Sequence, residues 1–488
     1  MVTFVGLITF LFFFFKGIIF LDPDFGWHLK MGEIITSFGI PKADPFSYTM
    51  STFPFIDHEW LSNVFIHIFH SSIGIWSLSF VFAIFTFGAI YLSLKRDPRN
   101  LVFWELPVVL SIGILYAYFG VRPQVESWLL WAIFLAITLN EKRWKKWNFF
   151  LPILFLIWVN LHGSFAVGLV TLFIIGALRF WAKRKLEKDY LKIFIASLLV
   201  TFINPYGPRI WHEVWLQVSD SSLRLSILEW QPAFFSFNLP FVIYSTLSAS
   251  LIWRQRDKFK LEELGLYLFF LILGISSVRH VPLWIILSLP LTIKAIRLTF
   301  ESTKKIQYAQ ERFNKVYGIG LYGAQVILAI QFFLVLGGAF SFSESRFYPK
   351  EALSYIKENL PKGEIFSEYG WGGYLDWKLP EKKVFIDGRM PSWRWKGSPE
   401  NESGYAMKDY KNILSGKVNY SQEFEKYNID TLLWPRHEYK GFFDTISEKL
   451  TNVLFKEKKG FDLVGKLEAD RWKKVYEDKV AVIYKKLE

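Results

Sequence analysis

The sequence has 488 residues, of which 52% are hydrophobic and 19% aromatic, with 57 basic and 44 acidic side chains. Several apolar runs approach or exceed the roughly 18 residues that span a bilayer, which excludes an ordinary soluble domain. Much of the net charge of +13 lies in short loops on one side of these runs, so we assign it to membrane topology and predict no nucleic-acid partner.

The hydrophobic runs predict the membrane spans in chain order. The first, 2–21, has no basic leader and no small-residue cleavage site, so we expect a retained span. The later runs are 61–94, 101–119, 125–139, 149–159, 165–181, 191–203, 239–254, 261–277, 282–296 and 318–340. With the basic loops in the cytoplasm, about eleven spans place the N-terminus inside and the C-terminus outside. We predict an α-helical polytopic protein of the cell membrane, with a transmembrane domain over 1–340.

From Ser341 onward the composition becomes that of a soluble domain. Apolar residues at helical spacing predict an amphipathic helix over 349–359. Short strand-like runs at 364–367, 383–387 and 431–434 follow, and the chain ends in a hairpin that turns at Glu477-Asp478. These elements predict an extracytoplasmic α/β domain over 341–488.

Ionisable side chains crowd the first outer loop, residues 22–60, between the first two spans. A charge beside hydrocarbon costs several kcal/mol unless it is paired or hydrated, so this density indicates an active site. We expect Asp24, with Asp22 as second choice, to act as a general base, and the pair could hold a divalent cation, Mg or Mn, through oxygen ligands. The structural alternative is that these acids only mark a membrane boundary or a helix N-terminus. The candidates are Asp22, Asp24, His28, Asp57, His58 and Glu59; Asp44 is expected in a structural turn.

Cationic side chains lie in other loops of the same face. An arginine there can bind a phosphate bidentately, and its alternatives are headgroup anchoring or an ion pair. The spans carry almost no acids at their midpoints, unlike most transporters, so the polar groups indicate an interfacial enzyme. The phosphate-binding candidates are Arg122, Arg279, His280 and His162, with Arg224 a weaker one. Arg209, Trp211 and the Glu229-Trp230 pair are weaker functional candidates, because tryptophans at this depth usually anchor a protein at the membrane interface, although aromatic rings can also stack on sugars.

These motifs resemble a known superfamily. The run from Asp22 through Gly32-Glu33 and Gly39-Ile40-Pro41 to Asp57-His58-Glu59-Trp60, before many helices and an exported domain, resembles the first loop of GT-C membrane glycosyltransferases. These include oligosaccharyltransferases, protein O-mannosyltransferases and aminoarabinose transferases, and the closest likeness is to prokaryotic members.

A second similarity lies in the soluble domain, where 365–375 and 383–389 are similar in layout to the Trp-Trp-Asp-Tyr-Gly region of oligosaccharyltransferases. This chain has Glu368-Tyr369-Gly370 there, so sequon recognition is not implied. Arg122-Pro123-Gln124 also stands where those enzymes carry acidic metal ligands.

The resemblance implies transfer of a sugar from a polyprenyl-phosphate-linked donor to a glycan, lipid or protein acceptor on the extracytoplasmic face. The turn of Trp371, Gly372, Gly373 and Tyr374 is expected to bind the acceptor, because its glycines permit close backbone approach. No cofactor beyond the possible cation is expected. Two alternatives stay open, a flippase or transporter of lipid-linked glycans and a non-catalytic membrane scaffold.

Overall fold

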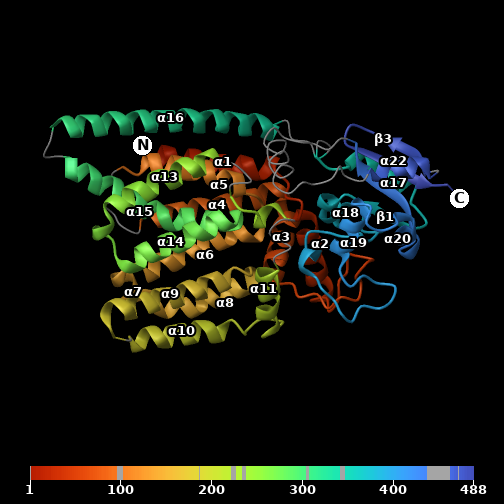
Figure 1. Cartoon of the computed structure of the whole chain (residues 1–488), viewed down its shortest axis with the longest axis horizontal. Coiled ribbons are helices and arrows are strands. Elements are labelled where there is room, and N and C mark those ends of the chain that lie inside the picture. The colour runs from red at the N-terminus through yellow and green to blue at the C-terminus, as the bar shows by residue number, and fades with distance from the viewer. Residues whose placement is uncertain are drawn as a thin grey trace. The chain divides into compact units, whose positions relative to one another are not determined.

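The chain divides into two compact units, each built from two segments. The computed structural model describes residues 2–95, 103–185, 187–220, 227–233, 238–303, 307–340, 344, 347–436, 462–470 and 472–487. The helical unit comprises Met1–Phe20 and Ser72–Phe342, and the mixed unit comprises Leu21–Ser71 and Ser343–Glu488 (Figure 1). The first outer loop therefore packs with the C-terminal segment, whereas the sequence analysis placed it in the transmembrane domain.

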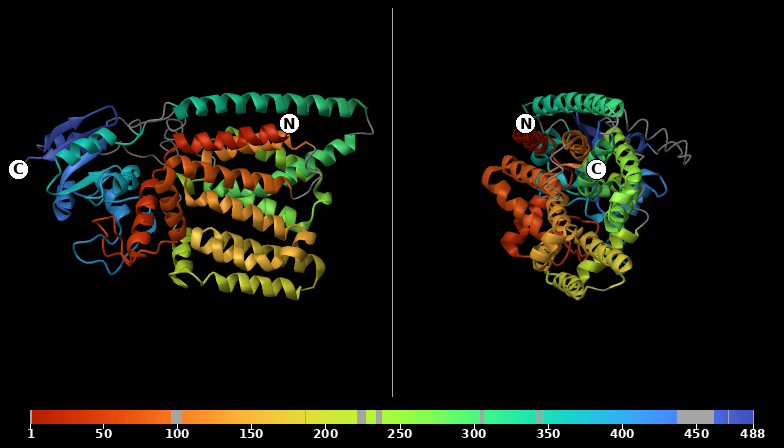
Figure 2. Two further views of the ribbon diagram at one scale, coloured as in Figure 1. Left: turned by 180° about the vertical axis from the view of Figure 1, so that it is seen from behind. Right: turned by 90° about the vertical axis from the view of Figure 1, so that its left-hand side faces the viewer.

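Helices make up the described part of the helical unit, and α8, α9 and α10 lie side by side in it (Figure 2). Helix α1 packs against α4 and α16, and α4 packs against α6. The helices are α1 (Val2–Ile19), α4 (Ile75–Leu94), α5 (Glu105–Tyr118), α6 (Pro123–Thr138), α7 (Glu141–Trp147), α8 (Leu151–Leu161), α9 (Phe165–Lys183), α10 (Lys188–Val200), α11 (Arg209–Ser219), α13 (Leu239–Arg254), α14 (Leu261–Ser276), α15 (Val281–Thr303) and α16 (Gln307–Phe340). Short 3-10 turns are η2 (Asn148–Phe150), η3 (Leu228–Trp230), η4 (Arg256–Lys258) and η5 (Val278–His280).

Within the described residues, four helical segments are long and apolar enough to cross a membrane: Ile75–Leu94, Phe165–Lys183, Val278–Thr303 and Gln307–Phe340. Shorter apolar segments are Val5–Ile19 and Glu105–Tyr118. Each of the eleven hydrophobic runs is largely helical, although several helices begin or end outside the predicted bounds. The protein is accordingly a membrane protein, and the number of spans stays a prediction.

The run expected as one span over 61–94 is two helices, α3 (Trp60–Ile73) and α4. Gly74 separates them with a φ of 75°, which an α-helix cannot contain. As far as Ser71, α3 belongs to the mixed unit. The single continuous span predicted here is therefore wrong.

The mixed unit contains a four-stranded sheet in the order β1-β2-β4-β3. Strands β1 and β2 are parallel, and the other neighbours are antiparallel. The strands are β1 (Glu364–Ser367), β2 (Ile429–Pro435), β3 (Trp472–Glu477) and β4 (Ala481–Lys486), and the helical elements are α2 (Phe25–Phe38), α3, α17 (Lys350–Glu358), η7 (Tyr369–Trp371), α18 (Gly372–Lys378), η8 (Met390–Ser392), α19 (Ala406–Leu414), α20 (Tyr420–Lys426) and α22 (Leu463–Ala469). The expected amphipathic helix, two of the three strands and the terminal hairpin are confirmed.

The expected strand at 383–387 is wrong, because the first outer loop pairs with this run instead of the sheet. The backbone N–H of Tyr48 donates to the carbonyl of Val384 at 3.1 Å, and the N–H of Val384 donates to the carbonyl of Phe46 at 2.9 Å. The hydroxyl of Thr49 donates to the carbonyl of Phe385 at 2.6 Å. Only an isolated bridge between Ser47 and Val384 results.

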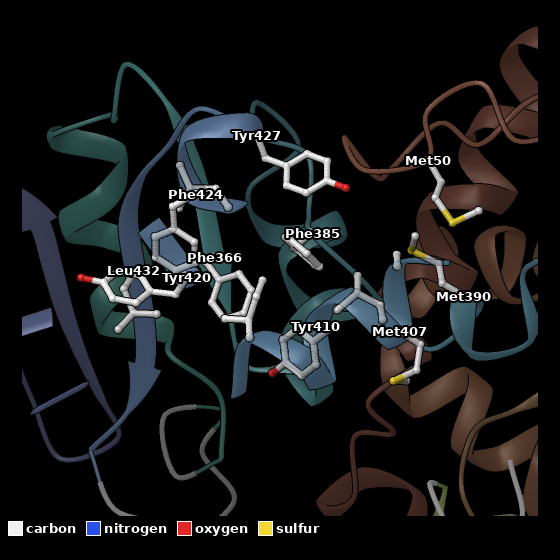
Figure 3. Packing of buried hydrophobic residues seen from close by; sticks show 14 of the residues in the cluster. Met50, Phe366, Phe385, Met390, Met407, Tyr410, Tyr420, Phe424, Tyr427 and Leu432 are labelled. Carbon is white, nitrogen blue, oxygen red and sulfur yellow. The ribbon is translucent and has the colours of Figure 1, made fainter. Parts of the chain in front are cut away.

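The hydrophobic core of the mixed unit is shared between its two segments. Phe366 of β1 packs edge to face on Phe385, with ring centroids 5.0 Å apart, and it stacks on Tyr410 of α19. Met50 from the first outer loop lies near Met390 and Met407 in the same cluster (Figure 3). Because the core includes side chains of both segments, the loop and the C-terminal segment are parts of one folded body.

Candidate active site

Asp22 and Asp24 lie at the start of α2, within the mixed unit. The backbone N–H of Asp24 donates to Oδ1 of Asp22 at 3.0 Å, which fixes the chain between them. Asp22 is buried and Asp24 is half-buried. Helix α2 begins at Phe25, so the Asp24 carboxylate lies at the positive end of the helix, yet it makes no capping hydrogen bond. The Asp24 carboxylate is therefore not used as a helix cap.

His28 belongs to a buried chain of hydrogen bonds that reaches Asp57. The amide Nδ2 of Asn63 donates to Oδ2 of Asp57 at 2.7 Å, so the amide oxygen of Asn63 faces His28. That oxygen lies 2.6 Å from Nδ1 of His28. An amide oxygen only accepts, so Nδ1 carries a proton and Nε2 is the ring nitrogen whose protonation can change. Gly32 permits this contact, because a Cβ there would lie 2.1 Å from the carbonyl oxygen of Asn63.

Glu59, a later acid of the same loop, lies close to His28. Nε2 of His28 is 3.9 Å from Glu59, and Nε2 of His58 is 3.8 Å from it. Burial raises the pKa of Asp57 to about 6, although hydrogen bonds from the Glu59 backbone and Asn63 and the charge of Arg389 oppose the rise. The structure therefore brings His28, Asp57, His58 and Glu59 together, as the sequence indicated.

The turn from Trp371 to Tyr374 packs against α2. Trp371 Nε1 donates to the carbonyl of Phe347 at 3.1 Å, and Tyr374 is buried. A Cβ on Gly373 would lie 2.5 Å from the carbonyl oxygen of Pro23. A Cβ on Gly372 would lie 2.5 Å from the carbonyl oxygen of Ile386. The glycines thus serve the packing of the mixed unit, and acceptor binding by this turn stays a prediction.

A buried ion cluster that the sequence analysis did not find lies beside these motifs. Arg389 donates from its backbone N–H and its Nε to Oδ1 of Asp387, at 2.8 and 3.0 Å. Its Nη1 lies 2.7 Å from Oδ1 of Asp44. The same Oδ1 accepts from the backbone N–H of Phe46, and Oδ2 of Asp44 accepts from that of Ser47. Asp44 therefore forms the expected turn and, in addition, an ion pair.

Asp376 of α18 is the second residue that was missed. It is buried, and neither of its carboxylate oxygens accepts a hydrogen bond from the described residues. Burial raises its pKa, and the nearby carboxylates of Asp387, Asp44 and Asp24 add to this effect against the charge of Arg389. The one feature of the sequence that could have drawn attention to Asp376 is its position three residues after Gly373, which places both residues on the same face of a short helix.

In the helical unit, Arg122 is held by partners of its own. Its Nη1 forms an ion pair with Glu229, and its Nη2 lies 3.4 Å from the carbonyl of Tyr118. With its amide oxygen turned toward Arg122, Gln124 accepts from Nε and Nη2. Burial raises the pKa of Glu229, but the charges of Arg122 and Arg279 outweigh it and hold this pKa below its usual value.

His162 and Arg279 lie together in the same unit. The backbone N–H of Ser164 donates to Nδ1 of His162 at 3.1 Å, so Nδ1 is an acceptor and the neutral ring carries its proton on Nε2. That Nε2 lies 3.5 Å from Nη2 of Arg279. Two donors therefore point toward one another, and the guanidinium of Arg279 lies over Trp230, 5.1 Å from the ring centroid. Such an arrangement suits an anionic acceptor shared by both groups.

The other cationic candidates are placed as follows. His280 is half-buried in η5, directly after Arg279. Arg209 is exposed at the first position of α11, and Trp211 of the same helix donates from Nε1 to the hydroxyl of Thr201 at 3.1 Å. Arg224 lies outside the described residues.

Asp22 and Asp24 are the candidate ligands of the possible divalent cation. Within the described ranges, no three His, Cys, Asp or Glu side chains are arranged to hold a metal ion. Asp22 and Asp24 alone do not complete such a ligand set.

The comparisons with known proteins agree with this architecture. No protein-family model and no curated protein matches the sequence. Among solved structures, the oligosaccharyltransferase of Archaeoglobus fulgidus in its apo form is similar with a TM-score of 0.54 and 12% identity, over 89% of this chain and 69% of that chain. The same enzyme tethered to an acceptor peptide containing the NVT sequon has a TM-score of 0.51 at 12% identity, over 88% of this chain and 69% of that one. ArnT from Cupriavidus metallidurans in the apo state has a TM-score of 0.51 at 11% identity, over 99% of this chain and 96% of that one. Both neighbours are GT-C superfamily members, and this chain has a GT-C-like fold.

Proposed function

We propose that the protein is an integral-membrane glycosyltransferase that moves a sugar from a polyprenyl-phosphate-linked donor to an acceptor on the extracytoplasmic face. The observation that carries this proposal is a half-buried carboxylate, Asp24, at a fixed point of the first outer loop in a GT-C-like fold. The acceptor class, a glycan, a lipid or a protein, is left open.

In the proposed reaction Asp24 takes the proton of the acceptor hydroxyl. The acceptor oxygen forms a bond to the anomeric carbon of the sugar, and the bond between that carbon and the donor phosphate oxygen breaks. The electron pair leaves with the phosphate, so negative charge grows there while the Asp24 carboxyl becomes neutral. A positioned base of this kind contributes roughly 10²–10⁴-fold to such a rate.

We assign the departing phosphate to Arg279 and the Nε2–H of His162. Their two donors face one another at 3.5 Å, and stacking on Trp230 holds the guanidinium in place. Donors fixed in advance stabilise a developing anion without having to reorganise. His280 follows Arg279 in the chain and is a further candidate. Arg122 already donates to Glu229 and Gln124, so we propose that it supports the site by holding Glu229.

His28 offers a second protonation site in the same loop as Asp24. Because the amide oxygen of Asn63 faces Nδ1, only Nε2 can exchange a proton with Glu59 or with an acceptor. We propose that His28 orients the acceptor hydroxyl. The buried Asp57 stabilises the Asn63 amide that fixes the histidine ring.

The experiment uses purified protein in vesicles that contain a labelled polyprenyl-phosphate sugar in one leaflet. A glycosyltransferase produces free polyprenyl phosphate and a glycosylated acceptor, both identified by mass spectrometry. A transporter moves the intact donor between leaflets, and a scaffold does neither. Detection of donor movement without any new covalent product would contradict the proposal. Comparison of lipids and glycans from cells with and without the protein would identify the sugar and the acceptor.

A further inference from the structure

The Asp24 side chain lies directly over Gly388, within the mixed unit. A Cβ built on Gly388 would fall 1.7 Å from Oδ1 of Asp24 and 2.7 Å from its Cγ. These distances are far below any real contact, so the carboxylate occupies the space that a side chain at position 388 would need. The two residues come from segments far apart in the sequence that fold together in this unit.

The turn that contains Gly388 is held rigidly on both sides. Asp387 accepts from the backbone and the Nε of Arg389, and Arg389 also pairs with Asp44. The guanidinium is enclosed by four aromatic rings whose centroids lie 4.7–5.8 Å away, those of Trp27, Phe46, Phe55 and Trp393. A buried, doubly paired arginine of this kind cannot shift without losing its partners.

The backbone of Asp24 is fixed as well. Its N–H donates to Asp22, and its carbonyl accepts from the N–H of His28 at 3.2 Å. A Cβ on Gly373 would lie 3.5 Å from the Cα of Asp24, so α18 packs against this stretch. With both backbones fixed, the group that must yield to an added methyl group at position 388 is the Asp24 carboxylate.

We propose that the Asp387-Gly388-Arg389 turn is a positioning element that aims the Asp24 carboxylate at the acceptor hydroxyl. This inference rests on the proposed function, because it assumes that Asp24 is the base. Through this turn, the C-terminal segment would take part in the chemical step. Gly388 acts only through Asp24, and its substitution re-aims the base without removing it.

The test is Gly388→Ala in the full-length protein, compared with Gly397→Ala as a matched control. A Cβ on Gly397 would have its nearest neighbour, Nε1 of Trp395, at 3.4 Å, which is an ordinary contact. We expect kcat of Gly388→Ala to fall on the order of 10²-fold, since an error of about 1 Å in a reacting group costs that much. The acceptor KM and donor binding should stay within about twofold of the wild type, and Gly397→Ala should match the wild type.

Unchanged kcat in folded Gly388→Ala would overturn the inference while leaving the proposed function intact. Wild-type transfer by Asp24→Asn would instead overturn the assignment of the base. The two failures are therefore distinguishable.

A cross-link tests the geometry independently, even where Gly388→Ala does not fold. The sequence contains no cysteine, so a double variant with Asp24→Cys and Gly388→Cys carries the only thiols. A Cβ at position 388 would lie 2.7 Å from Cγ of Asp24, the position that the Sγ of a cysteine would take, so we expect the two thiols to be within reach of one another. We expect this pair to form a disulfide on mild oxidation in the membrane and the pair Asp24→Cys with Gly397→Cys to stay reduced. Failure of the first pair to cross-link, or equal cross-linking of both, would overturn the inference.

Discussion

Nη1 of Arg389 lies 2.7 Å from Oδ1 of Asp44, and both side chains are buried. This ion pair joins the first outer loop to the C-terminal segment. Removing one partner of a buried pair leaves an uncompensated charge, which costs about 3–5 kcal/mol. We therefore expect Arg389→Ala to lower the free energy of unfolding of the mixed unit by this amount, measured by tryptophan fluorescence in denaturant.

Arg436→Ala is the matched control for that variant. Arg436 pairs with Glu477 at 2.9 Å, but both side chains are about one-third exposed or more, so the pair contributes about 1 kcal/mol or less. Equal losses from the two variants would contradict the structural role assigned to Arg389.

Asp57 gives the stability a defined pH dependence. Burial raises its pKa from 3.8 to about 6, so between these values the folded protein holds a proton that the unfolded chain has released. Stability should therefore fall by about 3 kcal/mol as the pH rises from about 4 to about 6, and this contribution should not change further above pH 6. Asp57→Asn should remove this part of the slope, measured as unfolding free energy at a series of pH values. An unchanged slope would contradict the burial of an ionising group at this position.

Asp376→Asn is expected to stabilise the protein at neutral and alkaline pH. Burial raises the pKa of Asp376, so its ionisation opposes folding as the pH rises above the ordinary range of a carboxyl group. An amide of the same shape removes that charge and can donate to nearby carboxylates. We expect a gain of about 1–3 kcal/mol at pH 8, the usual cost of a buried polar group without a hydrogen bond. Asp478→Asn is the control variant. The Asp478 carboxylate accepts from the backbone N–H groups of Val480 and Ala481, so we do not expect its replacement to stabilise the protein. A loss of stability in Asp376→Asn at pH 8 would contradict the account.

Arg279 and Arg122 should differ in their effects on donor binding. Hydrogen bonds to a charged group contribute about 1.5–3 kcal/mol, so Arg279→Ala should weaken binding of a polyprenyl phosphate by roughly 10–100-fold. Arg122→Ala should change that affinity by less than about threefold and reduce stability instead, since Glu229 loses its ion pair. Titration of each purified variant with the lipid separates the two roles. An equal loss of affinity in both variants would indicate that Arg122 also binds the phosphate.

Local patterns in the sequence predicted a helix in each apolar run and, in the mixed unit, α17, β1, β2 and the terminal hairpin, but not α2, α18, α19, α20 or α22. Apolar runs gave a helix in every expected position, and the spacing of Ala352, Leu353 and Ile356 predicted α17 correctly. The strand-like run at 383–387 failed because hydrogen-bond partners for its backbone come from residues 46–49, which strand propensity does not reveal. Gly74 could have indicated the break between α3 and α4, but a single glycine in an apolar run is a weak signal.

The candidate site was predicted in part. The density of acids in the first outer loop identified a group that the structure holds together through Asn63, which the sequence analysis overlooked. The partners of Asp24 and Asp44, Gly388 and Arg389, lie in the C-terminal segment, and no local periodicity connects residues so far apart. Asp376 was not singled out, because the sequence does not reveal that this carboxylate is buried.

Asp24 is the proposed base that removes the acceptor proton during sugar transfer. The most direct measurement is a single-turnover assay with labelled donor lipid bound to purified Asp24→Asn, beside the wild type and Asp22→Asn. We expect Asp24→Asn to bind the donor normally and to transfer sugar at least about 100-fold more slowly, because an amide cannot accept the proton. Transfer by folded Asp24→Asn at the wild-type rate would contradict the account.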